Sequence, residues 1–283
     1  MKIIKKILAS SLALSLALTF AACGGSKTES DVNSSANNSS SAPVSSEQKT
    51  DDKTLVMATN ASFAPYEYYA NGESGEIIGI DAEIAKAIAD KLGMQLKIED
   101  MAFNSIITSV MEGGVDFGMA GMTVTDERKE QVNFSNTYAT GKQVVIVKDG
   151  SDIASPDDLK GKKIGVQLTT TGDIYATDDY GKDEDGSLNG NVVEYNTGNE
   201  AVLALIGGDV DAVIIDNEPA KSFVASNANA NLKILETEYV YEEYAICVAK
   251  SNTELLTKLN TAIDELTEDG TIDKIISKYI KAE

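Results

Sequence analysis

The order of apolar and polar residues along the chain predicts strands and helices that follow one another. Residues 55–58 form a short apolar run that leads to the polar Asn60, a pattern typical of a buried strand. Residues 80–92 carry apolar side chains at helical spacing, and the Gly93 that follows favours a helix end there. In the same part of the chain we expect strands at 95–98 and 117–119, a helix at 105–111, and another helix that begins after Thr125.

The same alternation then starts again after a strand that begins at 144–147. Residues 155–158 read Ser-Pro-Asp-Asp, which combines a capping serine, a proline in the first turn and an acid three residues on, and therefore predicts a helix start. Further strands are expected at 163–166, 192–195, 212–215, 232–235 and 244–249, and helices from 171 and at 200–206, 219–225, 255–266 and 272–280. Two rounds of strand and helix predict an α/β protein with two lobes and mostly parallel sheets.

Parallel sheets of this kind bind ligands beyond the carboxyl ends of their strands. Four polar or small residues follow predicted strands and are therefore candidate site positions: Asn60, Gly121, Gln167 and Asp216.

The first residues predict an export signal over 1–22. Three lysines at positions 2, 5 and 6 precede a short apolar stretch at 7–20, and small residues then lead to Cys23. This arrangement resembles a lipoprotein cleavage site, in which the cysteine thiol is acylated, although Phe20 stands where that family prefers an aliphatic residue. An ordinary signal peptide with a cysteine nearby is the alternative. Residues 23–53 are rich in serine and almost free of apolar residues, so we expect a flexible tether behind a lipidated Cys23.

Composition narrows the classes of function. The chain carries 24 basic and 45 acidic residues, a net charge of −21, which disfavours nucleic acid as a partner and is in keeping with a soluble monomer. It has two cysteines and no histidine, which excludes zinc sites built from His and Cys and catalytic Ser-His or Cys-His pairs. We expect no metal and no cofactor. Cys247 lies in an apolar segment and is expected to be a buried, unreactive thiol.

Four stretches carry a resemblance to a known family. They are residues 58–68 (ATNASFAPYEY), 120–135 (AGMTVTDERKEQVNFS), 159–173 (LKGKKIGVQLTTTGD) and 210–216 (VDAVIID). Together they resemble the amino-acid-binding proteins of ABC importers, the bacterial extracellular solute-binding proteins of family 3.

The resemblance implies a two-lobed, type II periplasmic-binding-protein-like fold that closes on its ligand. It places the two crossings between the lobes near 138–142 and 240–244. The first lobe would then hold residues 54–140 and 242–283, and the second lobe residues 141–241.

The resemblance also assigns a carboxylate site around Arg128. A guanidinium matches a carboxylate with two parallel charge-assisted hydrogen bonds, which a lysine does not reproduce. Thr123 and the backbone at Gly121 would complete the cradle for the ligand's α-carboxylate, and Thr170 and Thr171 would add hydrogen bonds from the second lobe. Without the motif, Arg128 reads as a solvated charge on a helix.

The negative charge of the site is expected from Asp216, which ends an apolar strand and is suited to bind the ligand's α-ammonium. Its alternative role is to cap the helix that contains Pro219. Thr169 stands where the family often has glycine, which bears on the shape of that loop.

Phe63 and Phe103 match an aromatic pair that encloses the ligand side chain, although either could be plain core. Ligand choice is assigned to Asn60 and Gln167, two neutral amides, whereas relatives with cationic ligands commonly have an acid at the first position. The sequence therefore predicts a neutral polar amino acid such as glutamine, a preference that Tyr66, Glu67 and Met122 could change.

The expected function is capture of a free amino acid at the outer face of the cytoplasmic membrane and its delivery to an ABC permease with its ATPase. We expect no enzymatic activity. Two alternatives stay open: an enzyme that resembles cyclohexadienyl dehydratases, with Asp216 or Glu67 as acid or base, and a ligand sensor for a membrane receptor.

Overall fold

The computed structural model describes residues 54–72, 74–236 and 239–281 of the 283-residue chain. The predicted signal at 1–22, Cys23 and the tether at 23–53 lie outside these residues. Across the described ranges, there is no helix with the length and apolar character needed to cross a membrane.

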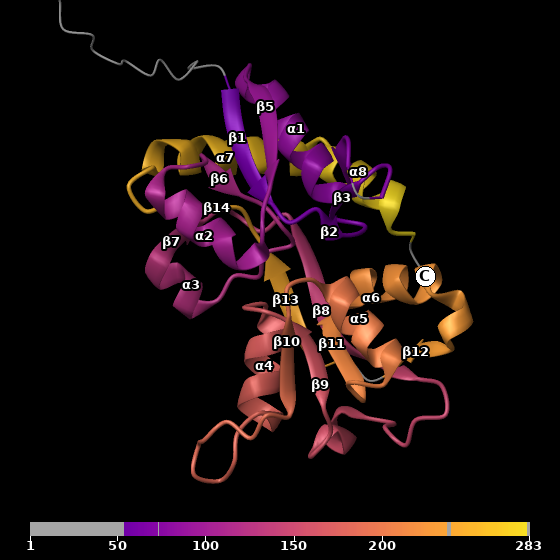
Figure 1. Ribbon diagram of the computed structural model, residues 1–283. Helices are drawn as coiled ribbons and strands as arrows, with labels where there is room; N and C mark the ends of the chain where they lie inside the picture. The colour runs from indigo at the N-terminus through magenta and orange to yellow at the C-terminus, as the bar shows by residue number, and fades with distance from the viewer. Residues whose placement is uncertain (1–53, 73, 237–238, 282–283) are drawn as a thin grey trace, which may run out of the picture. The chain divides into compact units, whose positions relative to one another are not determined.

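The first lobe is built on a mixed sheet (Figure 1). Its strands, in order across the sheet, are β5 (Gln95–Asp100), β1 (Thr54–Thr59), β6 (Phe117–Gly118), β14 (Cys247–Ala249) and β7 (Val132–Phe134). β5, β1 and β6 are parallel, and β14 is antiparallel to both of its neighbours, β6 and β7. The parallel part brings the carboxyl ends of β1 and β6 to the same edge.

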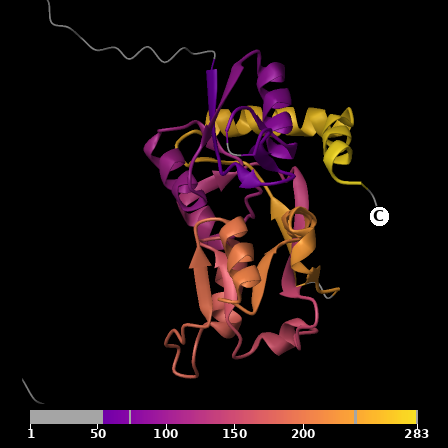
Figure 2. The same ribbon diagram turned by 45° about the vertical axis from the view of Figure 1, so that its right-hand side comes forward.

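Helices from both ends of the sequence belong to this lobe. They are α1 (Ile80–Leu92), α2 (Phe103–Glu112), α3 (Asp126–Gln131), α7 (Thr253–Glu268) and α8 (Thr271–Tyr279). Figures 1 and 2 show α7 and α8 beside α1, so the C-terminal helices complete the lobe that the N-terminal strands begin. A small antiparallel sheet of β2 (Ser62–Phe63), β3 (Glu67–Tyr69) and β4 (Ile77–Ile78) lies next to α1.

The second lobe has its own mixed sheet. The strand order is β10 (Val192–Tyr195), β9 (Ile164–Gln167), β11 (Ala212–Asp216), β8 (Ala139–Lys148) and β12 (Leu232–Ile234). β10, β9 and β11 are parallel, whereas β8 is antiparallel to β11 and to β12. The helices are α4 (Thr171–Tyr180), α5 (Gly198–Gly207) and α6 (Asn217–Ser226), with 3₁₀ turns η1 (Pro156–Leu159) and η2 (Ala228–Ala230).

Two adjacent strands connect the lobes. β8 pairs antiparallel with β13 (Val240–Tyr244), with Ala139 opposite Tyr244 and Gln143 opposite Val240. Figure 1 shows this pair running from the first lobe into the sheet of the second. The predicted lobe boundaries at 140/141 and 241/242 stay a prediction, because both strands run continuously through those positions.

Buried aliphatic and aromatic side chains hold each lobe together. Met57, Ile84 and Phe117 are fully buried in the first lobe, and Val145 and Ile164 in the second. Burying a side chain of this size contributes about 1.5–3 kcal/mol to folding. The periodic apolar residues that predicted the elements are thus the ones that form the cores.

Three predicted elements differ from the observed ones. The helix start at 155–158 forms its capping box but continues only as η1, because the chain turns at Gly161, with φ 78°, into β9. The strand predicted at 244–249 is divided into β13 and β14, because the chain leaves the sheet of one lobe and joins that of the other between Tyr244 and Cys247. Residues 178–191 are rich in acids and contain glycines, which is typical of a solvated surface loop, but the first three of them belong to the end of α4.

Candidate functional site

A pocket lies where strand ends and helix starts of the two lobes meet. The space free of protein atoms in and at the mouth of this pocket, open solvent included, amounts to about 310 Å³. Its lining residues are Asn60, Phe63, Glu67, Phe103, Ala120, Gly121, Thr123, Arg128, Gln167, Thr170, Thr171 and Asp216. This set includes all ten ligand-binding residues that the sequence suggested, together with Glu67 and Ala120.

Arg128 lies at one end of the pocket, on the short helix α3. Thr125 caps this helix with its hydroxyl, which accepts a hydrogen bond from the Arg128 N–H (3.2 Å). The guanidinium is buried, donates to the carbonyls of Thr123 (2.7 Å) and Thr169 (3.0 Å), and lies 5.4 Å from the centre of the Phe103 ring. Burial lowers its pKa, and the negative charge of Glu242 opposes that effect. Arg128 is therefore a buried cation held by carbonyl oxygens, not a solvated helix charge.

The backbone N–H of Gly121 already has a hydrogen-bond partner. Its N–H donates to Oδ2 of Asp81 (2.8 Å), a carboxylate that also accepts from the Tyr138 hydroxyl (2.8 Å). A role of the Gly121 backbone in a cradle for the ligand's carboxylate stays a prediction. Burial raises the pKa of Asp81 to about 6, although these two hydrogen bonds lower it.

The second lobe contributes the start of α4. The Thr170 hydroxyl accepts from the Asp173 N–H (3.3 Å) and donates to the Gln167 carbonyl (2.8 Å), so it caps the helix. Thr171 is the first helical residue, and its side chain is buried. A helix N-terminus presents backbone N–H groups to a ligand and favours an anion. Direct hydrogen bonds from Thr170 and Thr171 to a ligand stay a prediction.

Asp216 ends β11 and faces the pocket between the two ends. It stands at the capping position of α6, but its side chain makes no capping bond. It accepts instead from Nε2 of Gln143 (2.9 Å) and from the Tyr244 hydroxyl. Burial and the nearby Glu242 raise the pKa of Asp216 to about 7, while the two hydrogen bonds lower it. The helix-capping alternative is not what the structure shows.

The opposite end of the pocket contains two amides and an acid. Gln167 donates from Nε2 to Oδ1 of Asn60 (3.0 Å), and Asn60 donates to the Met101 carbonyl (2.9 Å). Glu67 is buried with 1% of its surface exposed; no nitrogen or hydroxyl donor of the described residues reaches its carboxyl oxygens, and its neighbour is the carboxyl group of Asp81. Burial and the nearby Asp81 raise the pKa of Glu67 well above its ordinary value.

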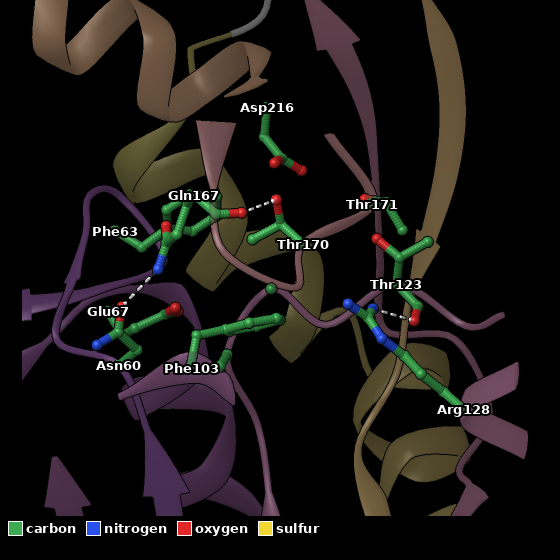
Figure 3. Close-up of a pocket in the computed structure, with 12 residues that line it drawn as sticks. Asn60, Phe63, Glu67, Phe103, Thr123, Arg128, Gln167, Thr170, Thr171 and Asp216 are labelled. Carbon is green, nitrogen blue, oxygen red and sulfur yellow. Dashed lines mark hydrogen bonds between the residues drawn. The ribbon is translucent and has the colours of Figure 1, made fainter. Parts of the chain in front are cut away.

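Figure 3 shows how these groups are arranged. Arg128 and Thr123 lie at one end, Asn60 and Glu67 lie at the other, and the Phe103 ring lies between. Phe63 is opposite Glu67 in the β2–β3 pair. The pocket thus has a cationic end, an aromatic middle, and an end that can accept hydrogen bonds.

Sequence reasoning missed Gln143, Glu242 and Tyr244, which support Asp216. A signal for them exists in the alternation of β13: Glu242 and Tyr244 are buried, whereas Tyr241 and Glu243 are exposed. An acid on the buried face of a strand is unusual and indicates a polar cluster.

Comparison with known proteins adds the family. The model of the bacterial extracellular solute-binding proteins, family 3, matches residues 55–282. The chain belongs to this family.

Similar proteins with assigned ligands include two from Bacillus subtilis (strain 168). The arginine-binding extracellular protein ArtP is 33% identical over 239 residues, which cover 84% of this chain and 91% of ArtP. The ABC transporter glutamine-binding protein GlnH is 34% identical over 215 residues, which cover 75% of this chain and 76% of GlnH.

Solved structures agree on the fold. An ancestral arginine-binding protein bound to glutamine has a TM-score of 0.73 at 40% identity, covering 81% of this chain and 99% of that one. The same kind of protein bound to arginine has a TM-score of 0.74 at 41% identity, covering 81% and 98%. This family member therefore has the two-lobed, type II periplasmic-binding-protein fold expected from the sequence.

Proposed function

We propose that this solute-binding protein captures a free α-amino acid between its lobes. The observation that carries the proposal is the buried pair of opposite charges, Arg128 and Asp216, in one enclosed pocket. An α-amino acid carries a carboxylate and an ammonium on one carbon atom, and these two groups would pair with Arg128 and Asp216. Desolvation makes both pairings stronger than they would be in water.

The far end of the pocket favours a side chain that donates hydrogen bonds. Glu67 is buried next to the carboxyl group of Asp81 and receives no donor from a nitrogen or a hydroxyl in the described part of the chain, so its ionised form is costly unless a ligand supplies donors. The guanidinium of arginine supplies several donors and a positive charge. L-Arginine is therefore our first candidate, which also fits the arginine-binding relatives.

L-Glutamine is the second candidate. Asn60 and Gln167, on which the prediction of a neutral polar ligand rested, hydrogen-bond to each other. Their pairing weakens the argument from these amides, but a protonated Glu67 would suit a neutral side-chain amide. The raised pKa of Glu67 supports that possibility.

The location and partners are inferred from the sequence and the family. We infer that Cys23 is lipidated, that the tether at 23–53 holds the lobes near the outer face of the cytoplasmic membrane, and that the ligand passes to an ABC permease with its ATPase. The relatives named above are binding proteins, which favours capture over catalysis. Turnover of prephenate or arogenate by the purified protein would instead support the enzyme alternative.

A thermal-shift screen of the purified full-length protein against the common amino acids tests the proposal. A ligand that binds the folded state raises the unfolding midpoint, and more so at higher excess over its Kd. We expect L-arginine to give the largest shift and L-glutamine a smaller one.

The variant Glu67→Gln tests the role of this buried acid. It should weaken arginine binding about 10- to 100-fold and change glutamine binding much less, because it removes a charge but keeps the shape. Glu76→Gln is the matched control, since Glu76 is an exposed acid in the neighbouring segment. Equal loss for both ligands would contradict the assignment, and a folded protein that responds to no amino acid would contradict the proposed function.

A further inference from the structure

The side-chain amide of Gln143 hydrogen-bonds to two buried carboxyl groups at the pocket. Nε2 of Gln143 donates to Oδ2 of Asp216 (2.9 Å) and to Oε2 of Glu242 (2.9 Å). The exposed fractions of the three residues are 0%, 6% and 5%, respectively. Asp216 lines the pocket, whereas Glu242 lines a neighbouring hollow together with Thr123 and Tyr175.

Three neighbouring strands bring these residues together. Asp216 of β11 is directly opposite Gln143 of β8, and β13 pairs with the other edge of β8, where Glu242 is opposite Gly141. The acids therefore come from the two strands that flank Gln143, one of which is a crossing between the lobes.

Among the described groups that face this cluster, acids outnumber cations. The titratable and charged groups that face the two acids are Arg128 of α3, Tyr175 of α4, Glu67 of β3, Tyr66, and Tyr244 of β13. Arg128 is the cation of this set, and its guanidinium donates to the carbonyl oxygens of Thr123 and Thr169. Oε1 of Glu242 is buried and has no hydrogen-bond partner. The ammonium of a ligand would bring a further positive charge to these acids.

We propose that Asp216, which Gln143 holds in a carboxyl pair with Glu242, keeps a proton in the empty protein and gives it up when the α-ammonium of the ligand binds there. Glu242 is then a positioning residue that acts through Gln143 and Asp216. In this exchange the O–H bond of the protonated carboxyl breaks and its proton goes to solvent, while the ammonium keeps its N–H bonds. The inference rests on the proposed function, because it needs a ligand with an ammonium group.

The pKa of Asp216 agrees with this geometry. Burial and the charge of Glu242 raise it to about 7. Below that pH the pair holds its proton, so the ligand must displace it, and binding weakens by up to about tenfold per pH unit. Above that pH the proton is already absent, and binding should become independent of pH.

Isothermal titration of the full-length protein with L-arginine and with L-glutamine tests the proposal. Titrations in buffers of different ionisation enthalpy give the number of protons released. With L-glutamine, which leaves the protonation of Glu67 unchanged, we expect about one proton per ligand at about pH 6 and close to none at about pH 8. Glu67 is the other buried acid of the pocket, so the same titrations with Glu67→Gln separate its contribution from that of the pair.

Glu242→Gln should abolish most of the proton release at about pH 6 while leaving binding at high pH within a few-fold of the original. Glu243→Gln is the matched control, because Glu243 is the next residue on β13 and is exposed. A purely structural role of Glu242 would weaken binding equally at every pH and leave the proton count unchanged, which would overturn the proposal.

The proton count of the unmodified protein decides the matter even if Glu242→Gln does not fold. Amino-acid binding without proton release at about pH 6 overturns the carboxyl pair and leaves the proposed function standing. Absence of binding heat and of thermal shift with every amino acid overturns both.

Discussion

At the scale of single residues, Thr169 has a backbone conformation that threonine rarely adopts. Its φ is 63°, in the left-handed region, where a β-branched side chain is strained. Its N–H donates to Oδ2 of Asp173 (2.9 Å), and its carbonyl accepts from Arg128 (3.0 Å). The contact with the buried guanidinium thus uses the backbone of Thr169 and none of its side chain. The family's frequent glycine at this position has a physical reason here.

Replacing Thr169 with glycine should therefore stabilise the protein. Relief of strain outweighs the added freedom of the unfolded chain, and we expect a gain of about 1 kcal/mol in the free energy of unfolding. Urea unfolding of the two proteins measures it. Thr170→Ala, which removes the cap of α4, should instead cost about 1 kcal/mol. A loss of stability in Thr169→Gly would show that the side chain is needed.

At the scale of elements, the two crossing strands depend on a close approach at Gly141. A Cβ atom built on Gly141 would lie 1.9 Å from the hydroxyl oxygen of Tyr244, the group that donates to Asp216. Because Gly141 has no side chain, the Tyr244 hydroxyl has room to pass β8 and donate to Asp216.

The variant Gly141→Ala should displace the Tyr244 hydroxyl. We expect a loss of about 1–3 kcal/mol in unfolding free energy from the overpacked contact, together with weaker amino-acid binding. Thr140→Ala, at an exposed neighbouring position of β8, is the control and should leave both nearly unchanged. Urea unfolding and calorimetric titration measure the two effects. Unchanged binding in Gly141→Ala would mean that Tyr244 does not support Asp216.

At the scale of the whole two-lobed body, hydrogen bonds between pocket residues join the lobes. Gln167 of β9 bonds to Asn60 beyond β1, and Arg128 of α3 bonds to the carbonyl of Thr169. The same residues therefore line the pocket and hold the lobes together. Ligand binding and lobe closure should be coupled for this reason.

A double-mutant cycle on Asn60 and Gln167 tests this coupling. If their hydrogen bond forms in the ligand-bound protein, the double variant Asn60→Ala/Gln167→Ala should lose about 1 kcal/mol less binding free energy than the sum of the single variants. Calorimetric titration with L-arginine gives the three values. Additive losses would mean that the two residues act independently.

Local patterns could be read from the sequence because their causes are local. Helix α1 begins and ends at the predicted residues, because its apolar spacing and Gly93 act within the helix itself. The division of 244–249 could not be predicted, since both halves are apolar and their sheet partners lie more than a hundred residues away.

The sequence by itself determined the alternation of strands and helices, the motifs of the family and the residues that line the pocket. Each of these depends on the periodicity of neighbouring residues or on short sequence motifs. The tertiary structure decided which polar groups are already paired. Only the packing of β8, β11 and β13 shows that Gln143 holds Asp216 and Glu242, and only the closed pocket shows that Glu67 is buried next to Asp81. Hydrogen bonding and burial join residues that are far apart in sequence, and so they are fixed only when the lobes are assembled.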